Sequence, residues 1–278
     1  MIVDAHHHLW DPATADYPWM TGALAPIRRR FTPDDLAPEL EATGVEGTIL
    51  VQTRSSEEET AEFLALAART PFIRGVIGWV DLTAPTVADA IAALRARPGG
   101  DRLVGVRHQA HDEPDPEWLL RDDVVRGIAA VGAAGLACDL LVRPRELPAA
   151  LELARRLPDV RFVIDHLAKP PIATGEVEPW RERIAAFADL PHVACKVSGL
   201  VTEAEWSSWT IEDLQPYVDH AIEMFGPERL LFGSDWPVCL LAATYEDVVE
   251  AALTTMSGFD VIGQAAVMGG NATRIYGL

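Results

Sequence analysis

The sequence predicts one α/β domain over residues 1–278, folded as a closed (β/α)8 barrel of the TIM type. Short runs rich in β-branched residues alternate with longer segments of Ala, Leu, Glu and Arg along the whole chain, which is typical of α/β folds. No linker rich in Gly, Ser or Pro divides these units into two halves. The length of 278 residues also fits one α/β barrel, a fold of about 250 residues.

Eight segments are expected to be β-strands. Each is separated from the next by enough residues for one crossover helix and two loops. The expected strands, in chain order, are Ile2–His8, Gly47–Thr53, Ile73–Leu82, Leu103–Gln109, Gly135–Val142, Arg161–Leu167, Val193–Gly199 and Arg229–Trp236.

The segments between the strands carry signals for helix ends. Thr32 and Pro33 supply an N-cap and a proline at the first helical position, and Gly44 ends that helix. The segment 56–69 is acidic at its start and basic at its end, as the helix dipole favours. An open, doubly wound sheet is the alternative. It would normally show a glycine-rich turn after the first strand, where three histidines stand instead.

Composition places the chain among acidic globular proteins. It has 42 Asp and Glu against 23 Lys and Arg, a net charge of −19, with 49% hydrophobic residues, which excludes an intrinsically disordered chain. The excess of carboxylates would repel a phosphate backbone, so nucleic acid is not expected as a partner. No apolar run approaches the ~18 residues of a membrane helix, and no basic, apolar leader precedes Asp4. We therefore expect a cytoplasmic protein without a membrane partner; no pattern indicates its oligomeric state.

Polar residues gather at the C-terminal ends of the expected strands. In a barrel these ends meet at one face, where the following loops build the active site. Histidine and aspartate at such positions are typical ligands of a divalent cation. The polar residues at these ends are His6, His8, Gln52, Asp81, Arg107, His108, His166, Lys196 and Asp235.

The first strand ends in a His-x-His pair. Side chains two residues apart share one face of a strand, so Asp4, His6 and His8 are expected to point the same way. His7 is expected to point the other way, into the layer between the barrel and its helices.

Two further strand ends carry candidate catalytic residues. His166 alone could be a strand-end histidine of the core, and Asp235 alone could form a turn. Closing a barrel places the eighth strand beside the first, however. This closure predicts that Asp235 lies next to His6 and His8.

Six motifs spread over nearly the whole chain resemble the amidohydrolase superfamily, and within it the amidohydrolase-2 branch of lactonases. They fall in register with the expected strands. The matching segments are Asp4–Pro12, Gly105–Gln109, Ile164–Pro170, Lys196–Leu200, Phe232–Val238 and Gly270–Thr273.

The resemblance implies a distorted barrel in which the first-strand histidines and the last-strand aspartate hold or flank a catalytic water. Sugar lactones or related cyclic esters are the implied substrates. The chain departs from the two-metal pattern of the superfamily, because Arg107 and His108 occupy the fourth strand end, where a carboxylated bridging lysine often serves. We therefore expect one divalent metal, most simply Zn²⁺, or none.

Lactone hydrolysis needs a water nucleophile, a base to take its proton and a group that stabilises the oxyanion. We assign the base to Asp235, which could also protonate the departing hydroxyl. His6, His8 and His166 are expected to polarise the carbonyl. With Asp235 they would hold a metal; without a metal, the histidines would donate hydrogen bonds to the carbonyl oxygen.

Five residues are candidate contacts for the substrate: Arg107, His108, Lys196, Trp10 and Gln52. Strand alternation places the first two on opposite faces, so one of them is expected in the pocket, and Arg107 suits a bidentate role. Lys196 is either a substrate donor or part of a buried ion pair. Trp10, in the long first loop, either covers the pocket or anchors that loop. With so few basic residues at the rim, a neutral sugar lactone is expected rather than a dicarboxylate.

A metal-dependent, non-oxidative decarboxylase of an aromatic or unsaturated carboxylate is the alternative function. Related lyases use a similar His-x-His and Asp site, but they need a metal and a clamp for an acidic substrate. A barrel that only binds a small molecule is disfavoured, because converging polar strand ends are costly to keep unless they are paired or ligated.

Overall fold

Eight parallel strands follow one another in chain order around a barrel in the computed structural model, which describes residues 1–278. Each strand pairs in parallel with the next one along the chain. This order confirms the predicted (β/α)8 barrel. The strands are β1 Ile2–His7, β2 Val45–Val51, β3 Ile73–Gly78, β4 Leu103–His108, β5 Ala137–Leu140, β6 Arg161–Ile164, β7 Val193–Val197 and β8 Leu230–Phe232.

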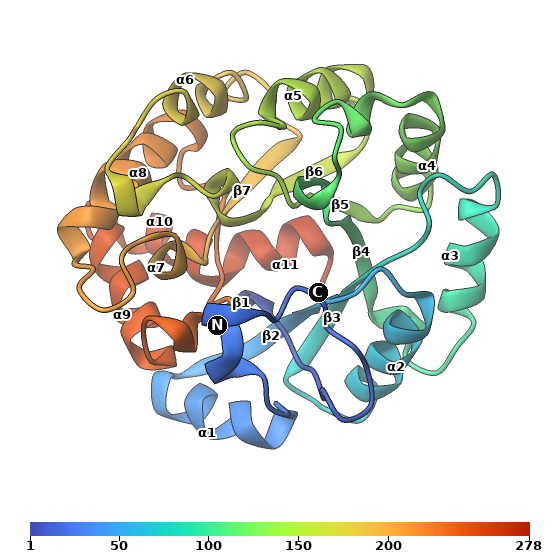
Figure 1. Cartoon of the computed structure of the whole chain (residues 1–278), viewed down its shortest axis with the longest axis horizontal. Helices are drawn as coiled ribbons and strands as arrows, with labels where there is room; N and C mark the ends of the chain where they lie inside the picture. The colour runs from blue at the N-terminus through green and yellow to red at the C-terminus, as the bar shows by residue number, and fades with distance from the viewer.

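Helices surround the strands and form the outer wall of the barrel (Figure 1). The first of them begins as the sequence predicts, with Thr32 and Asp35 in a capping box, Pro33 at the first position and Gly44 in the left-handed conformation at its end. The helices are α1 Pro33–Thr43, α2 Glu57–Ala67, α3 Val87–Arg95, α4 Asp122–Ala133, α5 Leu147–Arg156, α6 Trp180–Ala185, α7 Leu200–Glu203, α8 Ile211–Phe225, α9 Tyr245–Thr255, α10 Val261–Ala265 and α11 Asn271–Tyr276.

The barrel closes through the residues that follow β8 rather than through a full ladder. β8 has only three residues, and its pairing with β1 is limited to one parallel bridge between His7 and Trp236. Two backbone hydrogen bonds flank this bridge: Asp235 N–H donates to the His6 oxygen at 2.8 Å, and His8 N–H to the Trp236 oxygen at 2.7 Å. The barrel is therefore distorted at the seam where the candidate catalytic residues lie.

Two apolar layers stabilise the fold. The larger one lies between the strands and the surrounding helices. The smaller one fills the barrel and consists of inward side chains such as Val3 and Ile77 together with Ala272, Ile275 and Tyr276. The last three belong to α11, which lies across the middle of the ring of helices in Figure 1. The C-terminal helix thus contributes to the barrel interior.

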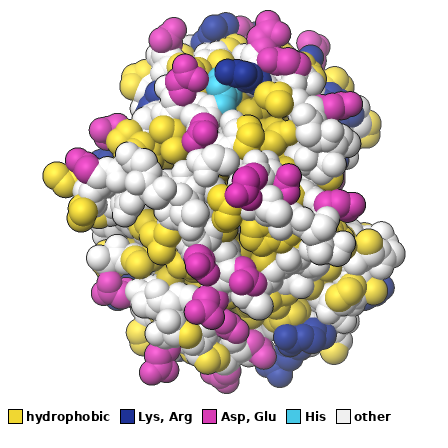
Figure 2. Space-filling view, turned by 90° about the vertical axis from the view of Figure 1, so that its left-hand side faces the viewer, with side chains coloured by type: hydrophobic (Ala, Val, Ile, Leu, Met, Phe, Trp, Pro, Cys, Tyr) yellow, Lys and Arg dark blue, Asp and Glu magenta, His cyan; other side chains and the backbone are white.

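The surface is predominantly acidic. On the face shown in Figure 2, Asp and Glu side chains are spread over the whole surface, whereas Lys and Arg gather near its upper and lower ends. This distribution agrees with the net charge of −19. None of the helices combines the length and the apolar character that crossing a bilayer requires.

Candidate active site

A cavity of about 550 Å³ lies at the C-terminal ends of the strands. This is the end at which barrels of this type build their sites. Of the candidate residues from the sequence, His8, Arg107, His166 and Asp235 line its wall. The wall also includes the loop residues Trp19, His111, Asp112, Arg143, Lys169, Glu203 and Trp206.

The structure brings His6, His8 and Asp235 together. Nε2 of His6 lies 3.1 Å from Nε2 of His8. Oδ1 of Asp235 lies 3.7 Å from the first of these atoms and 3.4 Å from the second. All three side chains are buried, and together they could hold a metal ion.

A β-bulge in β1 produces this convergence. Asp4 pairs with Thr48 and His7 with Leu50, so two residues of β1 lie opposite a single residue of β2. One extra residue reverses the alternation of side chains along a strand. Val3 and Ala5 both pack inside the barrel, and because of the extra residue His6 and His8 face inward as well.

The bulge overturns the expectation that Asp4 shares a face with His6 and His8. The Asp4 carboxylate instead accepts hydrogen bonds from the hydroxyls of Ser234 at 2.6 Å and Tyr245 at 3.0 Å. Because Tyr245 begins α9, the Asp4 side chain lies in the layer between the barrel and its helices. The expectation was wrong because strand alternation holds only for a strand without a bulge.

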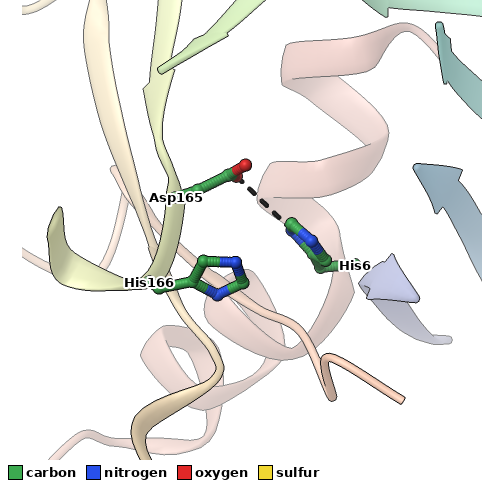
Figure 3. Close-up of side chains that lie close together, drawn as sticks. All are labelled: His6, Asp165 and His166. Carbon is green, nitrogen blue, oxygen red and sulfur yellow. Dashed lines mark ion pairs between the residues drawn. The ribbon is translucent and has the colours of Figure 1, made fainter. Parts of the chain in front are cut away.

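His166 reaches the site through a left-handed turn. The residues from His166 to Lys169 all have φ between 49° and 60°, a conformation that costs non-glycine residues roughly 1–2 kcal/mol each. The indole N–H of Trp180 donates to the carbonyl oxygen of Leu167 at 2.6 Å and holds the turn from outside. The turn ends β6 earlier than expected and brings the His166 ring centroid within 4.4 Å of that of His6 (Figure 3).

Gly199 gives His166 and Asp235 the room to approach each other. Its φ is +63°, and a Cβ at this position would lie 2.7 Å from Nδ1 of His166 and 3.0 Å from Oδ2 of Asp235. Any larger residue would therefore push both side chains aside. Nδ1 of His166 also lies 2.9 Å from the hydroxyl of the neighbouring Ser198.

The proton positions on His8 fit the role of a metal ligand. Nδ1 of His8 lies 2.8 Å from the carbonyl oxygen of Val51. A carbonyl oxygen only accepts hydrogen bonds, so Nδ1 carries the hydrogen in the neutral ring and Nε2 keeps its lone pair. A hydrogen bond of this kind is what orients metal-binding histidines in proteins. It also means that neutral His8 cannot donate a hydrogen bond from Nε2, as the metal-free mechanism requires.

The environment keeps the carboxyl group of Asp235 ionised and the neighbouring rings neutral. Burial acts to raise the pKa of Asp235, but the imidazoles of His166, His8 and His6 outweigh burial and hold this pKa below its ordinary value. Burial lowers the pKa of His166 to about 4 and that of His6 well below its ordinary value. At neutral pH a carboxylate therefore faces two neutral imidazoles, which is the state that a general base requires.

A buried ionic network lies behind the histidines. NH1 of Arg107 lies 3.0 Å from Oδ2 of Asp165, and Nζ of Lys196 lies 3.0 Å from Oδ1 of the same residue. Nζ of Lys196 is also 2.5 Å from Oδ2 of Asp139. Asp165 lies 3.4 Å from Nδ1 of His6, the pair drawn in Figure 3. Two cations and two carboxylates thus pair inside the barrel next to His6.

Of the five predicted substrate contacts, one lies on the cavity wall and four do not. Arg107 lines the cavity, whereas His108 points away and stacks on Trp118 with ring centroids 4.1 Å apart. Lys196 is fully buried in the ionic network, which is the second of its two expected roles. Gln52 is also fully buried, and its backbone oxygen accepts from NH2 of Arg107 at 2.6 Å.

Trp10 anchors the first loop rather than covering the cavity. Its indole N–H donates to the carbonyl oxygen of Ile27 at 3.1 Å, and its ring packs edge-on against Phe31 and Trp19. Trp19, from the same loop, reaches the cavity wall instead. Of these five residues, Arg107 is the one that lines the cavity.

Sequence reasoning overlooked Asp139 and Asp165. Each is a carboxylate in or directly after a mostly apolar strand, and each is at most 1% exposed. Buried carboxylates are almost always paired. Two acidic residues and Lys196 in such strands are therefore the signal from which the ionic network could have been inferred.

Comparison with known proteins gives consistent matches over the whole chain. The model of the amidohydrolase-2 family, described as "Amidohydrolase", matches residues 3–278. An L-fucono-1,5-lactonase from Burkholderia ambifaria is 40% identical over 280 residues, covering 99% of this chain and 94% of the relative. A protein of the same name from Burkholderia multivorans is 38% identical over 287 residues, covering 99% of this chain and 96% of the relative.

A solved structure matches equally well. The crystal structure of an amidohydrolase from Burkholderia multivorans with bound zinc superimposes with a TM-score of 0.93 at 38% sequence identity. The match covers 100% of this chain and 99% of the other one.

Proposed function

This chain belongs to the amidohydrolase-2 family, and on that premise we propose that it hydrolyses a small cyclic ester, with a neutral sugar lactone as substrate. The observation that carries the proposal is the convergence of His6, His8 and Asp235 beside the cavity, with Nε2 of His8 3.4 Å from Oδ1 of Asp235. The activity named for two relatives that are 38% and 40% identical supports the same reaction.

In the proposed mechanism Asp235 acts as the general base. It accepts a proton from water as the water oxygen adds to the lactone carbonyl carbon. The ring C–O bond then breaks, and Asp235 returns the proton to the departing oxygen, which leaves a hydroxy acid. The pKa of Asp235, held below its ordinary value, keeps the carboxylate ready at neutral pH.

His6, His8, His166 and Asp235 are the residues that we propose to hold one divalent metal, with zinc as the first choice because a solved relative contains it. The ligand atoms of His6, His8 and Asp235 lie close enough together for this, and His166 lies beside His6. When bound, such an ion would polarise the lactone carbonyl as a Lewis acid. The proton on Nδ1 of His8, fixed by Val51, supports this assignment. Arg107, held by Asp165, faces the same cavity and can donate a hydrogen bond to a substrate oxygen.

The charge of the cavity wall favours a neutral substrate. Arg107 is paired with Asp165, and Nζ of Lys169 lies 2.6 Å from Oε1 of Glu203. Arg143 is the one remaining basic residue of the wall, which also carries the carboxylates of Asp112 and Asp235. A dicarboxylate would find no pair of free cations here, whereas the polar groups and Trp19 and Trp206 suit the hydroxyls and C–H faces of a sugar ring.

A substrate panel tests the proposal. Proton release is followed with neutral 1,4- and 1,5-aldonolactones, including the 1,5-lactone of L-fuconate, and with lactones that carry carboxylates. We expect at least one aldonolactone to be hydrolysed with a catalytic efficiency inside the usual range for enzymes on their own substrates. A far higher catalytic efficiency with a carboxylated lactone would contradict the proposal of a neutral substrate. Metal-dependent release of CO2 from an aromatic acid, without lactone hydrolysis, would favour the decarboxylase instead.

A further inference from the structure

The ionic network behind the histidines continues to the C-terminal helix. The hydroxyl of Tyr276 lies 3.0 Å from Oδ1 and 2.9 Å from Oδ2 of Asp139. Asp139 in turn contacts Nζ of Lys196, and this ammonium group lies 3.3 Å from Nδ1 of His6. Four residues from α11, β5, β7 and β1 therefore form one continuous chain of contacts, which ends at a candidate catalytic histidine.

The residues of this chain of contacts are buried, and Asp139 has few other hydrogen-bond partners. Asp139 is 1% exposed and Lys196 is fully buried. The side-chain partners of Asp139 within hydrogen-bond distance are the ammonium group of Lys196 and the hydroxyl of Tyr276. Since water does not reach the carboxylate, loss of the hydroxyl would leave Lys196 to satisfy Asp139 alone.

The position of the Lys196 ammonium group affects which nitrogen of His6 carries the proton. Lys196 can only donate, so it favours a lone pair on Nδ1 of His6, whereas Asp165 can only accept and favours a proton there. The two contacts are nearly equal, at 3.3 and 3.4 Å. A small movement of the ammonium group toward Asp139 would therefore change the balance at Nδ1, and with it the state of Nε2, which lies 3.2 Å from NH1 of Arg107 and 3.1 Å from Nε2 of His8.

We propose that Tyr276 is a positioning residue of the active site. Its hydroxyl fixes Asp139, Asp139 and Asp165 together fix the ammonium group of Lys196, and Lys196 sets the orientation and the tautomer of His6. The C-terminal helix is thus part of the catalytic machinery, although Tyr276 lies inside the barrel and does not line the cavity.

The proposal rests on the proposed hydrolysis for its kinetic test, which uses Tyr276→Phe. This variant keeps the ring in the barrel interior and removes only the hydroxyl. We expect kcat on the best lactone to fall about tenfold, the lower end of the 10–100-fold loss seen when a group that orients a ligand is removed, with KM within about twofold. Tyr217→Phe is the matched control, because Tyr217 is equally buried and its hydroxyl contacts the backbone oxygen of Glu176, outside the ionic network of Asp139 and Lys196. The control should keep the kcat of the native chain.

A second readout does not depend on activity. In substrate-free, chelator-treated protein labelled with ¹⁵N-histidine, the ring nitrogen signals of His6 are identified by their loss in His6→Gln. Tyr276→Phe should shift the signals of His6 and leave those of the remote His192 in place, while Tyr217→Phe should move neither. Unchanged His6 signals in Tyr276→Phe, or a kcat equal to that of the control, would overturn the proposal. If the native chain hydrolysed no lactone, the labelled protein would still test the role of Tyr276.

Discussion

The backbone N–H of Asp235 donates to the carbonyl oxygen of His6 at 2.8 Å, and this hydrogen bond joins the end of the last strand to the first. The catalytic candidates therefore lie on the seam of the barrel. The same contact that closes the fold also sets the separation of the Asp235 carboxylate from the two imidazoles. Asp235 itself has a φ of +57°, a left-handed conformation that a short polar residue such as aspartate tolerates. This conformation turns the Asp235 side chain away from the direction of the strand and into the site.

Gly199→Ala should lower kcat as well as the free energy of unfolding. The added Cβ would meet Nδ1 of His166 at 2.7 Å, and the residue has a φ of +63°. Gly175→Ala is the matched control, because Gly175 has a φ of +68° but nothing within 4 Å of its Cβ position. Both variants should lose roughly 1–2 kcal/mol from the left-handed backbone. Only Gly199→Ala should also lose at least tenfold in kcat, measured with the best lactone; equal kcat values in the two variants would refute the role of the clash.

His7→Leu should flatten the pH dependence of stability. Burial lowers the pKa of His7 to about 3, and both ring nitrogens lack hydrogen-bond partners. Because the unfolded chain binds a proton on His7 near pH 6.5 and the folded chain does not, the free energy of unfolding falls as the pH is lowered from 6.5 towards 3. The slope from one such histidine approaches ~1.4 kcal/mol per pH unit.

The test compares urea unfolding of the native chain and of His7→Leu at pH 7, 6 and 5, both treated with chelator. Between pH 6 and 5 the variant should lose about 1 kcal/mol less than the native chain. The carboxyl of Asp139, whose pKa is raised to about 6 by burial, acts in the opposite direction but equally in both proteins. If the free energy of unfolding fell equally with pH in the two proteins, His7 would not be a buried neutral ring.

Removal of metal should lower turnover, and added zinc should restore it. The expectation follows from His8, whose Nδ1–H donates to the carbonyl oxygen of Val51, so that Nε2 is free to bind a cation. Equilibrium dialysis should show one tightly bound zinc per native chain and a large loss in His8→Ala. His192→Gln is the control, because Nε2 of His192 contacts the backbone oxygen of Ala154 away from the site. Turnover that is insensitive to exhaustive chelation would contradict this expectation.

Glu203→Gln should shift the substrate preference toward anions. The substitution removes the carboxylate 2.6 Å from Nζ of Lys169 and leaves an unpaired cation on the cavity wall. An extra contact between unit charges near water is worth ~1 kcal/mol, or about fivefold. The ratio of kcat/KM for a carboxylated lactone to that for a neutral one should rise by about this factor. A ratio that does not change would show that the Lys169 side chain does not face the bound substrate.

Patterns in the sequence were sufficient for the barrel and for the convergence of His6, His8 and Asp235, because both follow from alternation of elements and from closure. The orientation of Asp4 was predicted wrongly, since a single extra residue in β1 reverses every later side chain. No local sequence pattern predicts such a bulge.

The left-handed turn from His166 to Lys169 was also beyond prediction. Its four residues are not glycines, so their composition gives no sign of positive φ, and the turn is held by a side-chain hydrogen bond from Trp180, 13 residues after Leu167. The link from Tyr276 to Asp139 is tertiary in the same sense, because it joins residues 137 positions apart.

Replacement of Asp235 by asparagine tests the central claim most directly. Asparagine nearly preserves the volume and tolerates the left-handed backbone at this position, so Asp235→Asn should fold, while its amide cannot accept the proton of the attacking water. The measurement is kcat at saturating aldonolactone, with zinc content and thermal stability determined on the same samples. We predict a decrease of roughly 10² or more, the lower end expected for loss of a general base. A folded, zinc-loaded variant that retains the kcat of the native chain would contradict the assignment of Asp235 as the base.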